Sequence, residues 1–302
     1  MKTLIFLTLF AFSINGQGQT AEDYINRGVA KVIPEDYRGA IADFNKAIEL
    51  KPDYFNAYYN RAWCKYKLED YRGAIADFNK AIELNPDYAE TYYNRGIIKN
   101  ELQDNRGAIA DYTKAIELKP DDEKTYFNRG NAKDNIQDYA GAIADYNKVI
   151  KLKPDYFYAY NNRGVTKVKL EDYRGAIADF NKAIELNPDC FDAYNNRAWR
   201  KCYLEDYRGA IADYTKAIEL KPDVALGYFD RGNAKGKLND YVGAKADLNK
   251  AIELNPDYAD AYFVRGALKF TLKDKDGACL DWSKAGELGQ IKAYNYIKER
   301  CN

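Results

Sequence analysis

Histidine is absent from all 302 residues of the chain. This absence excludes Ser-His-Asp and Cys-His nucleophilic sites, histidine-held zinc or haem, and the most common general base at neutral pH. Net charge is absent as well, because 46 Lys and Arg residues balance 46 Asp and Glu residues. A balanced chain has no general attraction to DNA, RNA or anionic lipid, so we expect no nucleic-acid partner.

Cysteine and long apolar runs are scarce. Five cysteines are too few for a small disulfide-built domain, and they form no CxxC metal or redox motif. The one strongly apolar stretch covers residues 4–14. A helix of that length spans about 16 Å, against roughly 30 Å for the hydrocarbon core of a bilayer. We therefore expect no membrane span in the mature chain.

The N-terminus has the pattern of a secretory signal peptide. Lys2 supplies a positive charge, residues 4–14 are apolar, and small or polar residues follow around Gly16. We expect a signal peptide over residues 1–16, cleaved near Gly16, and a short segment over residues 17–20. The alternative is an N-terminal anchor or a buried helix. With cleavage, the protein lies outside the cytoplasm, in a periplasm or secreted.

The rest of the chain consists of eight similar 34-residue repeats. Residues 55–88 and 157–190 show the similarity clearly, and no insertion interrupts the period. The repeats fill residues 21–292 and leave no room for a linker or a second domain. Their first residues are 21, 55, 89, 123, 157, 191, 225 and 259.

Each repeat predicts two helices, as the second repeat illustrates. Asp70 is placed to cap a helix that runs from Tyr71 to about Leu84, and Pro86 ends that helix because proline lacks an amide donor. Asp87 is then placed to cap the first helix of the next repeat. One such hairpin cannot bury its own apolar face, so successive hairpins must stack.

This unit resembles the tetratricopeptide repeat (TPR). Small residues stand at repeat positions 8, 20 and 27 and proline at position 32, which in the second repeat are Ala62, Ala74, Ala81 and Pro86. Seven repeats match strongly and the eighth partly. The resemblance implies an all-α fold, a right-handed superhelical solenoid of eight helix-turn-helix units. A C-terminal capping helix over about residues 291–300 should follow, with residues 293–302 holding the rest of that helix and the tail.

Charged residues recur at fixed repeat positions, which is typical of a structural framework and not of a catalytic dyad. Arg at position 7 departs from the apolar residue usual in TPRs, and we predict that it pairs with Asp at position 23. In the second repeat, Arg61 would pair with Asp77, or with Asp43 or Asp111 of an adjoining repeat. Gly at position 19 predicts close approach of a neighbouring helix or of the arginine. We expect no enzyme activity, no metal and no cofactor.

The last repeat departs from the pattern. Gln290 replaces the usual proline, and a turn near residue 290 would fold the final helix back. Cys279 and Cys301 lie eleven residues before and after that turn, so an antiparallel pair places them at one level. A disulfide between them is one possibility, and two free thiols are the other.

The TPR resemblance implies that positions 2, 5, 9 and 12 of each first helix line a concave groove. These positions vary between repeats while the framework does not, and they are rich in aromatic and amide side chains. We take the candidate partner-binding residues from this set: Tyr59, Trp63, Tyr66, Tyr93, Asn100, Phe127, Asn131, Asn161, Asn195, Trp199, Phe229, Asn233 and Phe263.

Two classes of function fit this groove. The first is a non-enzymatic scaffold that binds a protein or an extended peptide, whose amides pair with asparagines while its side chains pack on rings. The second is a glycan-binding or cell-wall-associated module that uses Trp63 and Trp199 as stacking platforms. The same residues can also merely pack against each other. Position 5 is never Lys, so the carboxylate clamp of chaperone-binding TPRs is absent. A homodimer through the ends of the solenoid is a further possibility.

Overall fold

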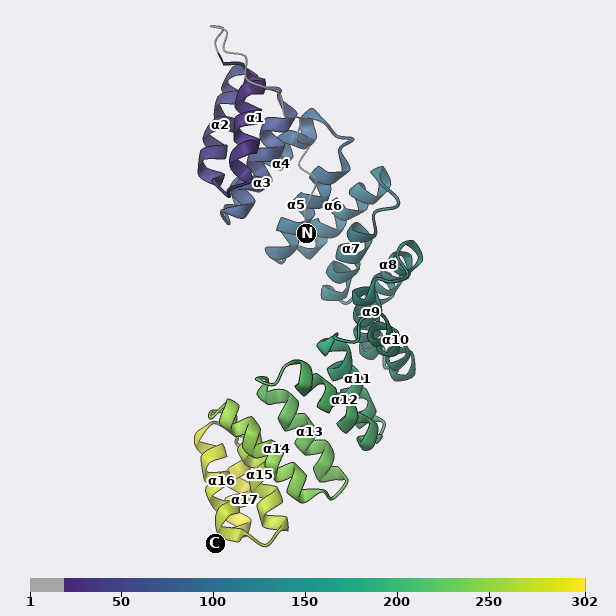
Figure 1. Ribbon diagram of the computed structural model, residues 1–302, viewed down its shortest axis with the longest axis vertical. Coiled ribbons are helices and arrows are strands. Elements are labelled where there is room, and N and C mark those ends of the chain that lie inside the picture. Colours follow the sequence, from purple (N-terminus) through teal and green to yellow (C-terminus); the bar gives the residue numbers. More distant parts are fainter. Residues whose placement is uncertain (1–18, 302) are drawn as a thin grey trace. The chain divides into compact units, whose positions relative to one another are not determined.

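Helices make up all the regular structure that a computed structural model describes, over residues 19–301. They follow one another as consecutive hairpins (Figure 1). The chain divides into an N-terminal body, up to Pro154, and a C-terminal body that begins at Asp155. The predicted signal peptide lies outside the described residues. No helix within residues 19–301 is long and apolar enough to cross a bilayer.

The N-terminal body holds four hairpins. The predicted second helix of repeat two is confirmed, because α4 begins at Tyr71 and ends at Leu84. The helices are Ala21–Val32 (α1), Tyr37–Leu50 (α2), Phe55–Lys67 (α3), Tyr71–Leu84 (α4), Ala89–Glu101 (α5), Asn105–Leu118 (α6), Glu123–Asn135 (α7) and Tyr139–Leu152 (α8).

The C-terminal body holds four further hairpins and one additional helix. The helices are Phe157–Lys169 (α9), Tyr173–Leu186 (α10), Phe191–Tyr203 (α11), Tyr207–Leu220 (α12), Ala225–Lys237 (α13), Tyr241–Leu254 (α14), Ala259–Thr271 (α15), Lys275–Glu287 (α16) and Lys292–Arg300 (α17). The expected final helix over about 291–300 is therefore confirmed as α17.

The second helix of every hairpin begins at an aspartate cap, as predicted. Asp70 accepts a hydrogen bond from the Gly73 backbone N–H, and the seven equivalent aspartates do the same. The glycine at position 19 serves this cap, because a Cβ on Gly73 would lie 2.1 Å from Asp70 Oδ2. The atoms nearest to this glycine therefore belong to its own cap and not to the arginine, while in four repeats a lysine of the neighbouring first helix donates to the glycine carbonyl.

The first helices begin one residue later than the sequence indicated. Tyr88, and not Asp87, is the N-cap of α5, and its side chain makes no capping hydrogen bond. The prediction that Asp87 caps this helix was therefore wrong. Position 34 of repeat three is Asp122, and its carboxylate does accept from the Thr125 backbone N–H at the start of α7. Position 34 is thus the cap position for the following repeat, and four of the eight repeats carry tyrosine there.

The turn inside each hairpin uses a left-handed residue that is not glycine. Glu69 has a φ of 61°, and position 15 is left-handed in all eight repeats. The Asp70 N–H donates to the Lys65 carbonyl and the Glu69 N–H donates to the Tyr66 carbonyl, which is the Schellman pattern. A residue with a Cβ is strained in this conformation, so each turn stores a small cost.

The predicted arginine–aspartate pair is confirmed within each repeat. Arg61 Nη2 lies 2.6 Å from Asp77 Oδ1, and the pairing recurs eight times. In every repeat the lysine at position 11 contacts the other carboxylate oxygen, as Lys65 does at 2.8 Å. The aspartate is buried, so its charge depends on both cations.

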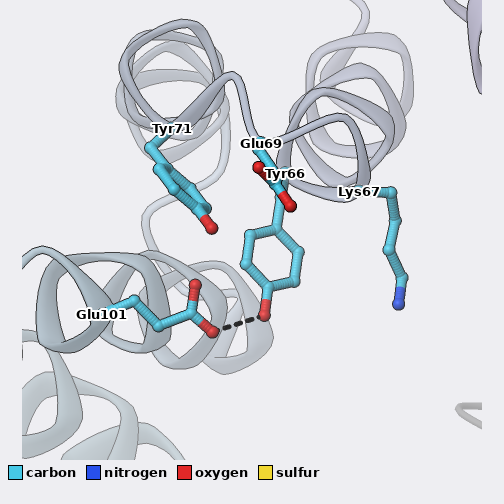
Figure 2. A pocket seen from close by; sticks show the side chains of 5 residues that line it. All are labelled: Tyr66, Lys67, Glu69, Tyr71 and Glu101. Carbon is cyan, nitrogen blue, oxygen red and sulfur yellow. Dashed lines mark hydrogen bonds between the residues drawn. The ribbon is translucent and has the colours of Figure 1, made fainter.

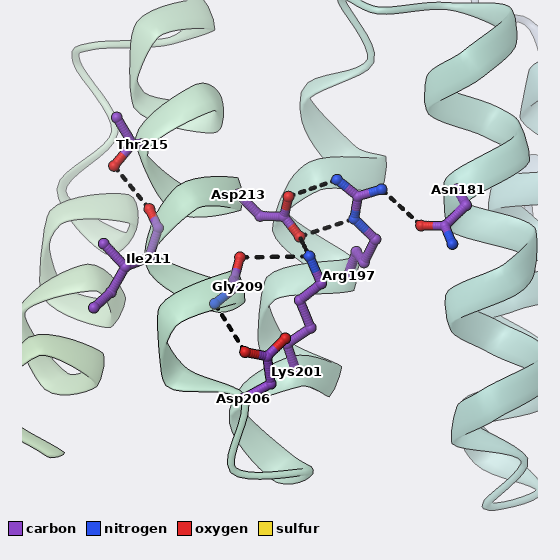
Figure 3. A network of polar contacts seen from close by, with 8 residues as sticks. All are labelled: Asn181, Arg197, Lys201, Asp206, Gly209, Ile211, Asp213 and Thr215. Carbon is purple, nitrogen blue, oxygen red and sulfur yellow. Dashed lines mark hydrogen bonds and ion pairs between the residues drawn. The ribbon is translucent and has the colours of Figure 1, made fainter. Parts of the chain in front are cut away.

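Figure 3 shows how this network links neighbouring repeats in the C-terminal body. Arg197 holds the Asp213 carboxylate with Nε and Nη2, and its Nη1 donates to Asn181 of the preceding hairpin at 2.6 Å. Its guanidinium also lies 5.6 Å from the Tyr194 ring centroid. The arginine therefore joins two helices of its own repeat to the repeat before it.

The C-terminal helix closes the last hairpin. Trp282 of α16 is fully buried, and its ring lies 5.2 Å from that of Tyr296 of α17. The structure joins Cys279 to Cys301 by a disulfide, with Cα atoms 5.8 Å apart. Packing and the covalent link together hold α17 over the end of the array.

Candidate functional site

The position-5 aromatics of the N-terminal body pack inside the stack of helices. Tyr59 lies 5.9 Å from the Phe78 ring and 5.4 Å from the Tyr88 ring. Its hydroxyl accepts a hydrogen bond from Asn94 Nδ2 at 2.9 Å, and burial raises its pKa. Tyr59 is therefore a packing residue with its hydroxyl already paired.

The next repeat uses the same arrangement, and the repeat after it keeps the ring contact. Tyr93 lies 6.1 Å from the Tyr112 ring and accepts from Asn128 Nδ2 at 3.1 Å. Phe127 lies 6.0 Å from Tyr146, whose hydroxyl donates to Asn131 at 2.8 Å. We call the contact between position 5 of one repeat and position 6 of the next a first-helix joint. At two joints of this body, an asparagine amide donates to a tyrosine hydroxyl, so the polar groups of both residues are paired.

An open cleft of about 350 Å³ lies beside α3 and α5 (Figure 2). Tyr66, Lys67, Glu69, Tyr71 and Glu101 line it. The Tyr66 hydroxyl donates to Glu101 Oε1 at 2.7 Å, and desolvation together with this carboxylate raises the tyrosine's pKa. Figure 2 shows the Tyr71 ring across the cleft from Tyr66. The cleft is shallow, and two tyrosine rings, two carboxylates and one lysine line it.

Two other groove candidates lie near this cleft. Trp63 packs at 5.8 Å against Tyr37 of the preceding repeat, and the Lys67 ammonium lies 5.2 Å from its centroid. Asn100 has a buried Oδ1 that meets no donor within the described part of the chain.

In the C-terminal body, several candidates are covered. Asn161 is buried and accepts from Asn196 Nδ2 at 3.2 Å, which is a first-helix joint between two amides. Phe229 lies 4.9 Å from the Tyr258 ring. Phe263 lies 5.0 Å from Tyr296 of the closing helix.

The half-buried Asn233 belongs to the same helix as Phe229, α13. Of the thirteen candidates, all but Trp199 are at least half covered by neighbouring side chains. Packing therefore accounts for most of the predicted groove residues, and α11 is where the surface differs.

Helix α11 presents exposed aromatic rings. Trp199 is 53% exposed and Tyr203, one turn later, is 62% exposed. The Arg200 guanidinium lies 4.7 Å from the Trp199 centroid and 5.8 Å from the Tyr173 centroid. Tyr173 also lies 4.5 Å from the Tyr203 ring. These four side chains form one surface patch, which we call the α11 patch.

A buried carboxylate adjoins this patch and is not among the site residues predicted from the sequence. Asp230 of α13 is 9% exposed, and burial raises its pKa to about 6 although a hydrogen bond with Trp199 lowers it. The sequence does mark Asp230 as a departure from the repeat pattern, because position 6 is Asn in the first six repeats and Asp only in the seventh. Tyr203 and Arg200 were missed because they stand at positions 13 and 10, outside the expected groove set.

No cluster of three or more His, Cys, Asp or Glu side chains suited to a metal ion occurs within residues 19–301. Cys64 and Cys190 are buried and reduced, and burial raises the pKa of both thiols. The groups that these elements bring together are ring faces, amides and one buried carboxylate.

Family profiles match most of the chain. Profiles described as tetratricopeptide repeat match residues 55–88, 89–122, 157–190, 191–224 and 229–286, and a profile described as TPR repeat matches residues 34–62 and 136–171. No curated protein sequence matches the chain.

Solved structures are similar in fold. The C-terminal part of a TPR repeat-containing protein from Cytophaga hutchinsonii is 23% identical, with 78% of this chain and 97% of that chain covered and a TM-score of 0.67. YrrB, described as a TPR protein with an unusual peptide-binding site, is 25% identical over 61% of this chain and 95% of its own, with a TM-score of 0.53. A TPR protein from Parabacteroides merdae is 22% identical, with 94% of this chain and 100% of that chain covered and a TM-score of 0.52. With its 34-residue period, its paired helices and these matches, the chain belongs to the tetratricopeptide-repeat family.

Proposed function

We propose that the protein is a non-enzymatic scaffold that binds a protein or an extended peptide through its first helices. The observation that carries this proposal is the exposure of Trp199 and Tyr203 on α11. Elsewhere the framework charges are paired within their own repeats, and the aromatics at position 5 are packed. Large exposed rings beside a polar group are typical of the centre of a recognition surface. The likeness to YrrB supports a peptide as the ligand.

We also propose that the protein works outside the cytoplasm. The pattern of residues 1–16 supports export, and the Cys279–Cys301 disulfide suits an oxidising compartment. Periplasmic fractionation of the native cell, with a cytoplasmic marker as control, tests this. Recovery of the full-length, uncleaved chain in the cytoplasm would overturn it. Association of two copies through the end of the array at α1 stays a prediction, which light scattering tests.

Selection from a displayed random-peptide library tests the scaffold proposal. Peptides that the purified chain enriches are then titrated calorimetrically against the chain and against the double variant Trp199→Ala, Tyr203→Ala. We expect at least a tenfold weaker Kd for the variant. Val242→Ala is the matched control, because Val242 is 81% exposed on a second helix, α14.

Failure to enrich any peptide, or equal binding by the double variant and the parent, would contradict the assignment to α11. Tyr59, Tyr93 and Phe127 are unsuitable for this test. Their rings are packed inside the N-terminal body, so truncation would lower stability as well as binding.

A glycan-binding function is the second candidate, and the cleft of Figure 2 favours it. Its two tyrosine rings can face the apolar side of a sugar, and Glu101 can accept from sugar hydroxyls. A glycan array probed with the chain and with Tyr71→Ala separates the two candidates. Loss of glycan binding in the variant would favour a glycan ligand. An array without any signal would contradict a glycan ligand and would be consistent with the peptide proposal.

A further inference from the structure

Asp230 differs from the other buried aspartates of the protein. Eight of them stand at repeat position 23, and each is held by an arginine and a lysine of its own repeat. Asp230 stands at position 6 and makes no ion pair within the part of the chain that the structure describes. Its Oδ2 is buried and has no hydrogen-bond partner there. Burying an ionised carboxylate without a cation costs free energy of folding. Asp230 therefore offers a position where a cation from a ligand can bind.

At the first-helix joint, Asp230 stands in the place of a residue that donates a hydrogen bond. At the preceding joint Asn196 donates its amide to Asn161 Oδ1. One repeat later the corresponding residues are Asp230 and Asn195, and an ionised carboxylate has no proton to donate. Asn195 Oδ1 is accordingly also buried and without a donor among residues 19–301. The two positions that hold a donor and an acceptor at three other joints thus carry two buried, unpaired acceptor oxygens here.

The side chains whose interactions reach Asp230 are aromatic or neutral. Trp199 hydrogen-bonds to its carboxyl group. Burial and, in smaller part, this carboxylate raise the pKa of Tyr258 to about 12. The same two causes raise the pKa values of Cys202 and Tyr214. Because burial raises the pKa of Asp230 only to about 6, the group is ionised at pH 7.5. The joint therefore presents negative charge and ring faces together.

Trp199 connects this joint to solvent. Its indole contacts Asp230 and is also 53% exposed in the α11 patch. Arg200 already lies 4.7 Å from the indole centroid, which shows that this ring accepts a guanidinium. A movement of the indole would give a ligand from solvent access to both acceptors.

We propose that Asp230 and Asn195, beside Trp199, receive the guanidinium group of an arginine side chain in a bound peptide. The planar guanidinium has five donors, so it can serve a carboxylate and an amide oxygen together while it stacks on the indole. A lysine ammonium is a point charge and suits the flat ring less well. This inference rests on the proposed peptide-binding function and names a side chain that the peptide should carry.

Nuclear magnetic resonance of the indole N–H groups tests the proposal. The chain has three tryptophans, so a ¹⁵N-tryptophan-labelled sample gives three indole signals, and Trp199→Phe identifies one of them. The probe is N-acetyl-arginine methylamide at pH 7.5, and N-acetyl-citrulline methylamide is its neutral isostere. We expect a saturable shift of the Trp199 signal with the arginine compound only, and unmoved signals for Trp63 and Trp282.

Asp230→Asn is the matched variant, because the first six repeats carry Asn at this position and their hairpins fold. We expect it to bind the arginine compound at least tenfold more weakly. Arg200→Gln removes a competing cation from the indole, and we expect it to bind at least as tightly as the parent. An equal shift with citrulline, full binding by Asp230→Asn, or no Trp199 shift would each overturn the arginine site.

The arginine site and the scaffold function fail separately. If library peptides bind and the Asp230→Asn variant binds them as well as the parent does, the scaffold stands and the arginine site is wrong. If the arginine compound shifts Trp199 but the library yields no peptide, the site stands and the scaffold proposal fails.

Discussion

Two first-helix joints of this protein differ at both of their residues and in how their polar groups are paired. Between α3 and α5, Asn94 donates its amide to the Tyr59 hydroxyl at 2.9 Å. Between α11 and α13, Asp230 stands where that asparagine would be, and Asn195 stands where the tyrosine would be. At the second joint, Asp230 Oδ2 and Asn195 Oδ1 are both buried acceptors without a donor in the described part of the chain.

The framework around the two joints is the same. Arg95 and Arg231, each one residue after the joint, pair with Asp111 and Asp247 at 2.5 and 2.7 Å. The difference teaches that a repeat protein can change the two residues of a joint while an unchanged framework keeps the helices in place. Four predictions test or sharpen this comparison.

The largest effect should come from the framework itself. Arg95→Met and Arg231→Met each leave a buried aspartate with only its lysine, so we expect each to lower the free energy of unfolding by about 3 kcal/mol. Urea unfolding followed by circular dichroism measures this. Similar losses would show that the two joints rest on equivalent frameworks, and a loss below about 1 kcal/mol for either would contradict that.

Asp230→Asn should stabilise the protein in a pH-dependent way. Asp230 titrates near 3.8 when unfolded and near 6 when folded, so its contribution to stability falls as the pH rises from about 4 to 6. We expect the variant to exceed the parent by about 2–3 kcal/mol at pH 7.5 and to equal it at pH 4. Urea midpoints at both pH values measure the difference. The same gain at both pH values would show that ionisation is not its cause.

The converse change should transfer the defect to the preceding joint. Asn196→Asp places a carboxylate against Asn161 Oδ1, which is buried, and removes the amide that now donates to it. We expect a loss of about 1–2 kcal/mol at pH 7.5 that disappears near pH 4, where the protonated acid can donate. Asn196→Ser, which keeps a donor, is the control. A loss that is independent of pH would point to packing and not to charge.

The smallest effect concerns the turns, which both regions share. Glu69 and Glu205 are exposed and have φ values of 61° and 62°. Glycine relieves the left-handed strain, and the greater freedom of the unfolded chain offsets part of that gain. We expect Glu69→Gly and Glu205→Gly each to raise the free energy of unfolding by about 0.5 kcal/mol. Destabilisation by either change would mean that the glutamate side chain contributes contacts to the turn.

The repeat itself made most of the fold predictable. The aspartate cap at position 16, the end of the second helix before proline and the Arg61–Asp77 pair all followed from residues at fixed spacing. The differences concern local geometry: Asp87 is not a cap, and Gly73 faces the Asp70 carboxylate. Both depend on one residue of helix phase or on the reach of one side chain, which a pattern of residue types does not resolve.

The sequence by itself determined the number of hairpins, their boundaries to within about a residue, the paired framework charges and the closing helix, because each depends on local spacing that repeats. Only the tertiary structure decided which aromatic side chains are buried and which are exposed. Tyr59 and Trp199 both lay in the predicted groove, yet Tyr59 is packed among other rings and Trp199 is half exposed. The same holds for Asp230, whose missing partner depends on what the neighbouring helix places opposite it.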